Sequence, residues 1–241
     1  MGAGDATIVG MKDIQVVGFD ADDTLWVTEP HFQAAGREFG GLMAPWASAE
    51  KAAEELYATE MANLGTYGYG AKSVMLSMLE TALRLGGDKV PAATLRKVLE
   101  SGRRLLDYPM ELLPGVEGVL KELRGRYRLV LITKGDLLDQ ERKLRGSGLK
   151  AYFHHVQILS DKRESDYRDL LATLGVEPRR FLMVGNSLKS DILPVLALGG
   201  CGVHIPYEVT WRHEHVEGAS PDPARFRQLK DISGLPGLLA R

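Results

Sequence analysis

The sequence predicts an α/β protein, built on an open parallel sheet with helices on both faces and carrying an all-helical insertion. Two observations support this fold class. Short and mostly continuous apolar runs alternate with helical segments in the second half of the chain. Such runs are typical of parallel strands that are covered on both faces. A long stretch with helix signals and no strand signal separates the first apolar run from the second.

Apolar runs bounded by turn residues or charges are predicted to be buried strands. There are five of them, at 14–20, 128–133, 155–160, 181–186 and 201–206. Predicted helices lie between the later runs, at 136–148, 164–175 and 187–200. A strand–helix–strand order at this spacing indicates right-handed crossover connections, and therefore a Rossmann-like sheet.

The chain between the first two strands is far longer than one crossover requires, and it is predicted to be helical. One helix is expected over 48–65, with Ser48 as N-cap and Gly65 as its end. A second is expected over 69–87, and a third over 91–108, where Pro91 suits a first turn. We therefore expect a small helical module inserted after the first strand.

Composition excludes several classes of protein. The 241 residues include 30 Lys and Arg and 32 Asp and Glu, and a net charge of −2 argues against broad neutralisation of nucleic-acid phosphates. The single cysteine, Cys201, cannot form an internal disulfide and fits a reducing compartment. The longest apolar stretch, 192–206, contains Pro and Gly and is shorter than the roughly 20 residues of a spanning helix. We expect a cytoplasmic protein with neither nucleic acid nor membrane as partner.

Acidic residues follow the first predicted strand, in the segment Asp20-Ala21-Asp22-Asp23-Thr24. In extended chain, residues i and i+2 point the same way, so Asp20 and Asp22 can face one site. The carboxyl ends of strands in an open parallel sheet are where ligands bind. Burial of these groups is costly unless they are paired or bind a metal. The alternative is an acidic loop that caps the following helix.

Further polar residues follow the later strands. Thr133 ends the second strand, Lys162 follows the third, and the fourth runs into Gly185–Asp191, where Asn186 and Asp191 offer oxygen ligands. Each has a structural interpretation on its own, as a helix cap, a surface lysine or an acid favoured by the helix dipole. Their occurrence at four successive strand ends favours a single site.

Together these residues resemble the haloacid dehalogenase-like hydrolase (HAD) superfamily, and FDADDTLW and VGNSLKSDILPVL resemble its phosphatase branch. The resemblance covers about 13–26 and 113–206. It implies a catalytic α/β core formed by residues 1–27 and 112–241. It also implies that residues 28–111 form a helical cap domain inserted after the first core strand.

The resemblance further implies a phosphomonoester hydrolase acting on a small phosphorylated metabolite. Asp20 would attack phosphorus and form an aspartyl-phosphate. Asp22 would act as general acid and then as general base. Thr133 and Lys162 would hold the phosphoryl oxygens. An acid two residues after the nucleophile favours phosphate transfer over cleavage of a carbon–halogen bond, which needs no proton donor.

Mg²⁺ is the implied cofactor, with Asp20, the backbone carbonyl of Asp22 and the last motif as ligands. Many relatives begin that motif with Gly-Asp, whereas this chain has Gly185-Asn186, so Asn186, Asp191 or both remain open as ligands. Many relatives also have Pro after the lysine of the third motif, and here Arg163 follows Lys162.

Two other functions remain open at this stage. A phosphomutase or phosphotransferase would use the same scaffold with a second hydroxyl in place of water. A phospho-accepting switch protein would also present acids, Thr and Lys at strand ends. The identity of the substrate and the oligomeric state do not follow from the sequence. The segment His213-Glu214-His215 is predicted to be a solvated loop, because a zinc site needs more ligands than it offers.

Overall fold

The structure is a computed structural model that describes residue 11, residues 13–216 and residues 218–240. The chain divides into two compact units. The first, called the sheet unit, contains the chain up to Val27, Glu111–Thr133 and the chain from Ser147 onward. The second, called the helical unit, contains Thr28–Met110 and Lys134–Gly146.

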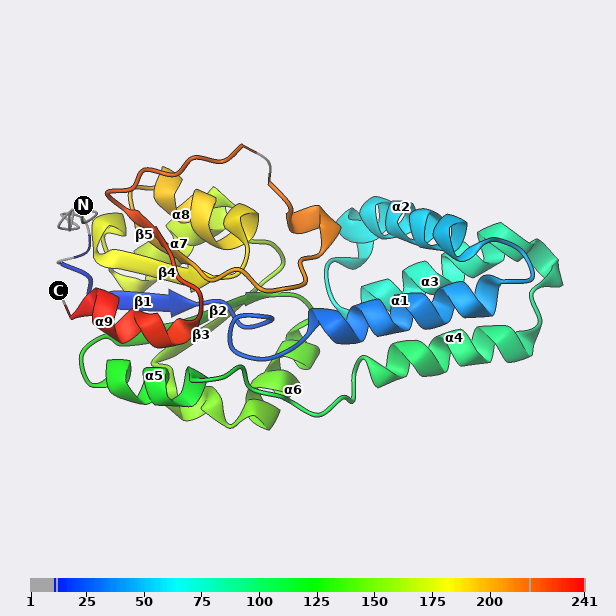
Figure 1. The fold of residues 1–241 in the computed structure, drawn as a ribbon, viewed down its shortest axis with the longest axis horizontal. Helices are drawn as coiled ribbons and strands as arrows, with labels where there is room; N and C mark the ends of the chain where they lie inside the picture. Colours follow the sequence, from blue (N-terminus) through cyan, green and yellow to red (C-terminus); the bar gives the residue numbers. More distant parts are fainter. Residues whose placement is uncertain (1–10, 12, 217, 241) are drawn as a thin grey trace, which may run out of the picture. The chain divides into compact units, whose positions relative to one another are not determined.

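The sheet has six strands in the order β3-β2-β1-β4-β5-β6 (Figure 1). Their bounds are Val16–Phe19 (β1), Arg128–Lys134 (β2), His155–Leu159 (β3), Phe181–Gly185 (β4), Cys201–His204 (β5) and Phe226–Gln228 (β6). Strand β1 is parallel to both of its neighbours, and Val16 pairs with Arg128 on one side and with Phe181 on the other. The predicted α/β fold with a Rossmann-like parallel sheet is confirmed. The short strand β6 is an addition that the sequence did not predict.

Two helices cover one face of the sheet, α7 (Glu164–Leu174) and α8 (Leu193–Ala197). Alternate strand residues point to this face, and they form one buried cluster with Tyr167 and the leucines of α7. Gly18 lies within this packing, where a Cβ would come within 2.6 Å of the Phe181 ring. The other helices of this unit, α5 (Val116–Arg124) and α9 (Leu235–Leu239), pack against each other, and Figure 1 draws α9 in front of β1.

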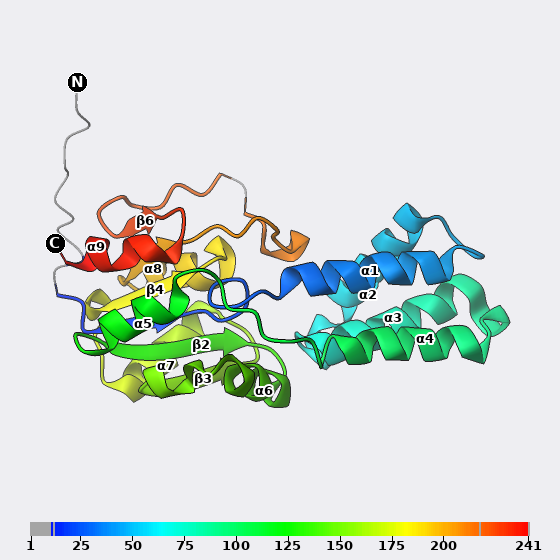
Figure 2. The same ribbon diagram turned by 60° about the horizontal axis from the view of Figure 1, so that its bottom comes forward.

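The helical unit has its own hydrophobic core. Figure 2 shows its helices side by side: α1 (Glu29–Met43), α2 (Ala49–Tyr67), α3 (Ala71–Gly86) and α4 (Ala92–Arg104). Ser48 caps α2 as predicted, since its side chain accepts from the backbone N–H of Lys51. Helix α2 continues past Gly65 and ends at Gly68, whose φ of 69° is the left-handed conformation that favours glycine.

Polar contacts also hold the helical unit together. Helices α2 and α3 meet at a buried pair of threonines, where Thr81 Oγ1 donates to Thr59 Oγ1 over 2.9 Å. The segment 134–146, which carries most of α6 (Leu137–Ser147), is joined to α3 by an ion pair of 3.0 Å between Lys72 Nζ and Asp136. This ion pair links the segment to the helices of the insertion.

Short 3-10 or π turns complete the fold. They occupy Gly87–Lys89, Leu149–Tyr152, Pro178–Arg180, Leu188–Ile192, Arg212–Glu214 and Ile232–Gly234. None of the helices in the described ranges is long and apolar enough to cross a membrane.

The first excursion of the chain from the sheet unit, over 28–110, begins and ends at neighbouring backbone positions. The backbone N–H of Val27 donates to the carbonyl of Glu111 over 2.9 Å, and Trp26 forms an antiparallel bridge with Leu112. The two ends of the helical insertion are therefore held next to each other by the sheet unit.

Candidate active site

The structure brings the predicted polar residues to one edge of the sheet. Asp20 follows β1, Thr133 is the last residue but one of β2, Lys162 follows β3 and Asn186 follows β4. Since these four strands are neighbours, their carboxyl ends meet at the same edge, where open parallel sheets bind ligands. Asp20, Thr133 and Lys162 are all buried.

Lys162 lies between two carboxylates. Its Nζ is 2.5 Å from Asp20 Oδ1 and 2.7 Å from Asp191 Oδ1, and only 1% of the lysine side chain is exposed. Burial alone would lower the pKa of Lys162, but the charges of Asp191 and Asp20 outweigh it and hold that pKa well above its ordinary value. The ammonium is therefore a fixed positive charge at the strand ends.

The carboxyl group of Asp20 is held on both of its oxygens. Lys162 binds Oδ1, and the Thr24 hydroxyl donates to Oδ2 over 3.0 Å. Thr24 in turn accepts from the backbone N–H of Asn186 over 3.0 Å, which links the loop after β1 to the loop after β4. Burial raises the pKa of Asp20 to about 7, against the lowering effect of Lys162 and with a further rise from Asp191.

Asp22 is held by the core of the sheet unit. The indole N–H of Trp26 donates to Asp22 Oδ1 over 2.8 Å, and Trp26 is fully buried. The loop between them folds back on itself, since the backbone N–H of Asp23 donates to the carbonyl of Trp26 over 2.7 Å. Asp23 adopts a φ of 59°, a left-handed conformation that Asp tolerates better than most residues.

The last motif forms a π-helical turn over Leu188–Ile192. Ser187 caps this turn, its hydroxyl accepting from the backbone N–H of Ser190 over 3.0 Å. Both oxygens of Asp191 are engaged, Oδ1 by Lys162 and Oδ2 by the backbone N–H of Ser187 over 3.0 Å. A Cβ on Gly185 would lie 2.2 Å from Asp191 Oδ2, so glycine is required for the carboxylate to sit there.

Polar atoms of three residues, Asp20, Asp22 and Asn186, converge at one point. One atom of the Asn186 side-chain amide lies 3.2 Å from Asp20 Oδ2 and 3.3 Å from the backbone carbonyl oxygen of Asp22. These neighbours are acceptors, so the amide satisfies them when it turns its nitrogen toward them. A bound cation would favour the amide oxygen instead, and a carboxylate, a backbone carbonyl and an amide oxygen are hard ligands that suit Mg²⁺. The residues present therefore fit a Mg²⁺ ion.

Few side chains that could bind a metal ion lie close to Asp20. Within the described residues, no group of three or more His, Cys, Asp and Glu gathers in a way that could hold a metal ion. The candidate ligands are accordingly of mixed type: Asp20, the carbonyl of Asp22 and Asn186. Asp191 lies on the other side of Lys162 in the hydrogen-bond network, as a partner of the lysine.

The structure adds residues that the sequence did not predict. The Tyr167 hydroxyl donates to the carbonyl of Ser190 over 3.0 Å. His204 Nε2 lies 3.0 Å from the carbonyl of Asn186, and since a carbonyl can only accept, Nε2 carries the proton. The predicted solvated loop at 213–215 is partly wrong, because Glu214 accepts hydrogen bonds from Ser187 and Ser190. Of these residues, only Tyr167 had a signal in the sequence, because the helical periodicity of α7 indicates that its side chain is buried.

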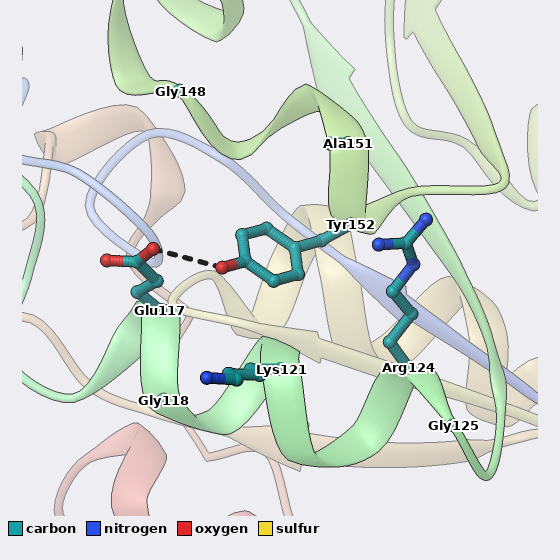
Figure 3. Close-up of a pocket in the computed structure, with 8 residues that line it drawn as sticks. All are labelled: Glu117, Gly118, Lys121, Arg124, Gly125, Gly148, Ala151 and Tyr152. Carbon is teal, nitrogen blue, oxygen red and sulfur yellow. Dashed lines mark hydrogen bonds between the residues drawn. The ribbon is translucent and has the colours of Figure 1, made fainter.

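A separate surface pocket lies between α5 and the turn Leu149–Tyr152 (Figure 3). Lys121 and Arg124 line it, and the Tyr152 hydroxyl donates to Glu117 Oε1 over 3.0 Å. None of the predicted site residues lines this pocket. The candidate chemistry therefore belongs to the strand ends and not to this pocket.

The open parallel sheet presents a buried aspartate, a lysine bridging two carboxylates and a threonine at neighbouring strand ends. A family model described as haloacid dehalogenase-like hydrolase matches residues 14–199. The chain belongs to this family, which confirms the resemblance drawn from its four motifs.

Known proteins similar to this chain include two phosphatases and one solved structure. Human N-acylneuraminate-9-phosphatase is 29% identical over 135 residues, which is 54% of this chain and 52% of that protein. Glyceraldehyde 3-phosphate phosphatase of Methanothermobacter thermautotrophicus is 29% identical over 134 residues, 52% of this chain and 58% of that protein. The chain thus matches little more than half the length of these relatives.

The solved structure is a haloacid dehalogenase-like family hydrolase from Xanthomonas campestris. It is 37% identical to this chain, with a TM-score of 0.85, and the match covers 95% of this chain and 91% of that one.

Proposed function

We propose that this chain is a Mg²⁺-dependent phosphomonoester hydrolase that acts on a small phosphorylated metabolite through an aspartyl-phosphate at Asp20. The observation that carries the proposal is the position of the Asp20 carboxyl group. Lys162 binds one of its oxygens, and the other faces Asn186 and the carbonyl of Asp22. This arrangement leaves one oxygen for a metal and one beside a fixed positive charge.

In the first half of the proposed reaction, a carboxylate oxygen of Asp20 attacks phosphorus and the ester P–O bond breaks. Protonated Asp22 gives its proton to the departing alkoxide, which leaves as an alcohol. In the second half, Asp22 takes a proton from water, the water oxygen attacks phosphorus, and the bond between Asp20 and phosphorus breaks. Inorganic phosphate leaves and Asp20 is a carboxylate again.

Positive groups stabilise the charge on the transferred phosphoryl group. Lys162 and the Thr133 hydroxyl would hold its oxygens, and electrostatic stabilisation of this kind is the main source of rate in phosphoryl transfer. Bound Mg²⁺ would supply the charge that offsets repulsion between Asp20 and the phosphate, with Asp20, Asp22 and Asn186 as its ligands. Asp191, for which the sequence also predicted a metal role, would act through Lys162 and through waters on the ion.

The division into a sheet unit and a helical unit supports distinct roles for the parts of the chain, and it differs from the bounds proposed here in that 134–146 lie in the helical unit. We propose that residues 1–27 and 112–241 form the catalytic core and that 28–111 form a cap that selects the substrate. The two phosphatases above are named for N-acylneuraminate 9-phosphate and glyceraldehyde 3-phosphate, and we include small phosphate esters of this kind among the proposed substrates. A cytoplasmic location, consistent with one free cysteine, completes it.

Release of inorganic phosphate from an aryl phosphate tests the proposal. The assay compares wild type with Mg²⁺, wild type with EDTA, and Asp20→Asn with Mg²⁺, with Asp13→Asn as a control for an exposed acid near the same strand. We expect phosphate release from the wild type and from Asp13→Asn in the presence of Mg²⁺. We expect none from the wild type with EDTA or from Asp20→Asn. Activity of Asp20→Asn at the wild-type rate would contradict the assignment of the nucleophile.

The same samples separate the alternatives. Transfer of the phosphoryl group to an added sugar hydroxyl, at the expense of free phosphate, would indicate a mutase or phosphotransferase. A phospho-Asp20 that persists after incubation with acetyl phosphate, seen by mass spectrometry, would indicate a switch protein. If no phosphate is released from the aryl phosphate, a panel of sugar phosphates is the next test, because a selective cap domain can exclude the aryl phosphate.

A further inference from the structure

We propose that Glu214 is a positioning residue for the reaction: it holds the turn that presents Asn186 and Asp191 to the site. The inference deepens the proposed function and rests on it. Glu214 lies in the short turn Arg212–Glu214, which comes from the loop after β5 and is no part of the four sequence motifs.

Glu214 ties together two residues of the last motif. Its Oε2 accepts from the Ser190 hydroxyl over 2.6 Å and also accepts a short hydrogen bond from the Ser187 hydroxyl. Hydrogen bonds from a hydroxyl to a carboxylate are charge-assisted and stronger than neutral ones. A single oxygen atom thus joins the residue that caps the π turn to a residue inside it.

The Ser187 hydroxyl, which caps the π turn, links Glu214 to the residues of the active site. The Ser187 hydroxyl accepts from the backbone N–H of Ser190 while it donates to Glu214. The backbone N–H of Ser187 donates to Asp191 Oδ2, and Asp191 Oδ1 binds Lys162. Movement of Ser187 would therefore disturb Asp191 and, through Lys162, the nucleophile. It would also move Asn186, the preceding residue.

The π turn depends on support from outside. The π-helix is rare, and its single turns are frequently found at functional sites. Buried Tyr167 supports the turn through the carbonyl of Ser190, and Glu214 binds the two serine hydroxyls. The turn Arg212–Glu214 is itself held, since Lys189 Nζ donates to the carbonyl of His213 over 2.9 Å.

Three variants test the role of Glu214. Glu214→Ala removes the acceptor, Glu214→Gln keeps a neutral acceptor of the same shape, and Ser190→Ala removes one of the two hydroxyls. Glu208→Ala is the matched control, since Glu208 is an exposed acid in the same loop. Hydrogen exchange by mass spectrometry reports on the turn, through the amides of Ser190 and Asp191. Steady-state kinetics with an aryl phosphate report on the site.

We expect Glu214→Ala to speed exchange at these two amides and to lower kcat about 10- to 100-fold, the range for residues that orient metal ligands. KM and the melting temperature should change little, and Glu214→Gln should recover part of kcat. Ser190→Ala should fall between wild type and Glu214→Ala, which keeps the test valid if Glu214→Ala fails to fold. Glu208→Ala should match the wild type in both readouts.

Several results would overturn the inference. Exchange or kcat of Glu214→Ala equal to that of the wild type would do so, as would a loss of kcat that only follows a loss of folded protein. If the wild type hydrolyses no ester, the proposed function fails instead, and the Mg²⁺ affinity measured by calorimetry decides. Weaker binding in Glu214→Ala then supports the positioning role; equal or absent binding in both proteins rejects it.

Discussion

The indole N–H of Trp26 donates to Oδ1 of Asp22 over 2.8 Å, so a side chain buried in the core of the sheet unit orients the proposed acid–base carboxyl. Asp22 itself is half-buried and lies in a loop. Its position therefore depends on a residue that substrate need not contact.

Trp26→Phe keeps the aromatic packing and removes the donor. We expect kcat to fall about 10-fold or more, since a hydrogen bond to a charged group is worth about 1.5–3 kcal/mol. The measurement is phosphate release under saturating substrate, with Trp46→Phe in the helical unit as a control for the loss of a tryptophan. An unchanged kcat in Trp26→Phe would show that Asp22 is oriented by other contacts.

Asp22→Asn removes the proton donor while keeping the shape. We expect hydrolysis to slow by roughly 10²–10⁴-fold, the usual range for loss of general acid–base catalysis. Rapid-quench mass spectrometry should then show phospho-Asp20 accumulating when the leaving group is a good one, because only the hydrolysis of the intermediate still needs the base. A wild-type rate at every pH would argue against this role.

Lys162→Met leaves Asp20 and Asp191 facing each other in a buried site. We expect a loss of about 3–5 kcal/mol in the free energy of unfolding, the range for breaking a buried ion pair on one side. Urea denaturation measures it, with Lys150→Met as the control at an exposed lysine. The double variant Lys162→Met/Asp191→Asn should recover part of the loss, and failure to recover any would mean that the lysine stabilises the fold through packing alone.

Asn186 is the proposed metal ligand whose side chain carries no charge. Asn186→Ala should weaken Mg²⁺ binding at least about 10-fold, whereas Asn186→Asp should strengthen it, because another negative ligand raises affinity for a divalent cation. Calorimetric titration with Mg²⁺ gives both values. Equal affinities in wild type and Asn186→Ala would shift the metal role toward Asp191.

Glu60 in α2 of the helical unit predicts a pH dependence of stability. Burial raises its pKa from 4.5 to about 7, and no hydrogen bond or ion pair reaches it from the described residues. The folded state therefore binds the proton more tightly than the unfolded state, so stability is lost as pH rises from about 4.5 through 7. Glu60→Gln should raise the melting temperature at pH 8 and leave it nearly unchanged below pH 4.5. Glu54→Gln, at an exposed position of the same helix, should show no such difference.

The sheet could be predicted because its strands are continuous apolar runs, and the site because polar residues interrupt the pattern where those runs end. Asp20, Thr133, Lys162 and Asn186 were all identified in this way, and the structure places them at one edge. Strand β6, with three residues, is too short for a periodic signal.

The supporting contacts could not be predicted, because they depend on loop geometry and not on spacing. The bond from Trp26 to Asp22 spans a loop in which Asp23 adopts a left-handed conformation. Glu214 reaches Ser187 and Ser190 from a loop after the next strand, and neither its residue type nor its neighbours in sequence indicate that it would. Which oxygens of the last motif remain free for a metal also depended on the hydrogen bonds of Asp191.

The hydrogen bond between Val27 and Glu111 holds the two ends of the helical insertion together at the sheet. The entropic cost of closing a loop grows slowly with the length of the loop. Replacing a turn of about five residues by this insertion therefore costs the sheet only ~2.5 kcal/mol. The helices bury a core of their own, which stabilises them locally. The helices between residues 27 and 111 can therefore be exchanged, in evolution or by design. The register of the strands and the residues at their ends would stay the same.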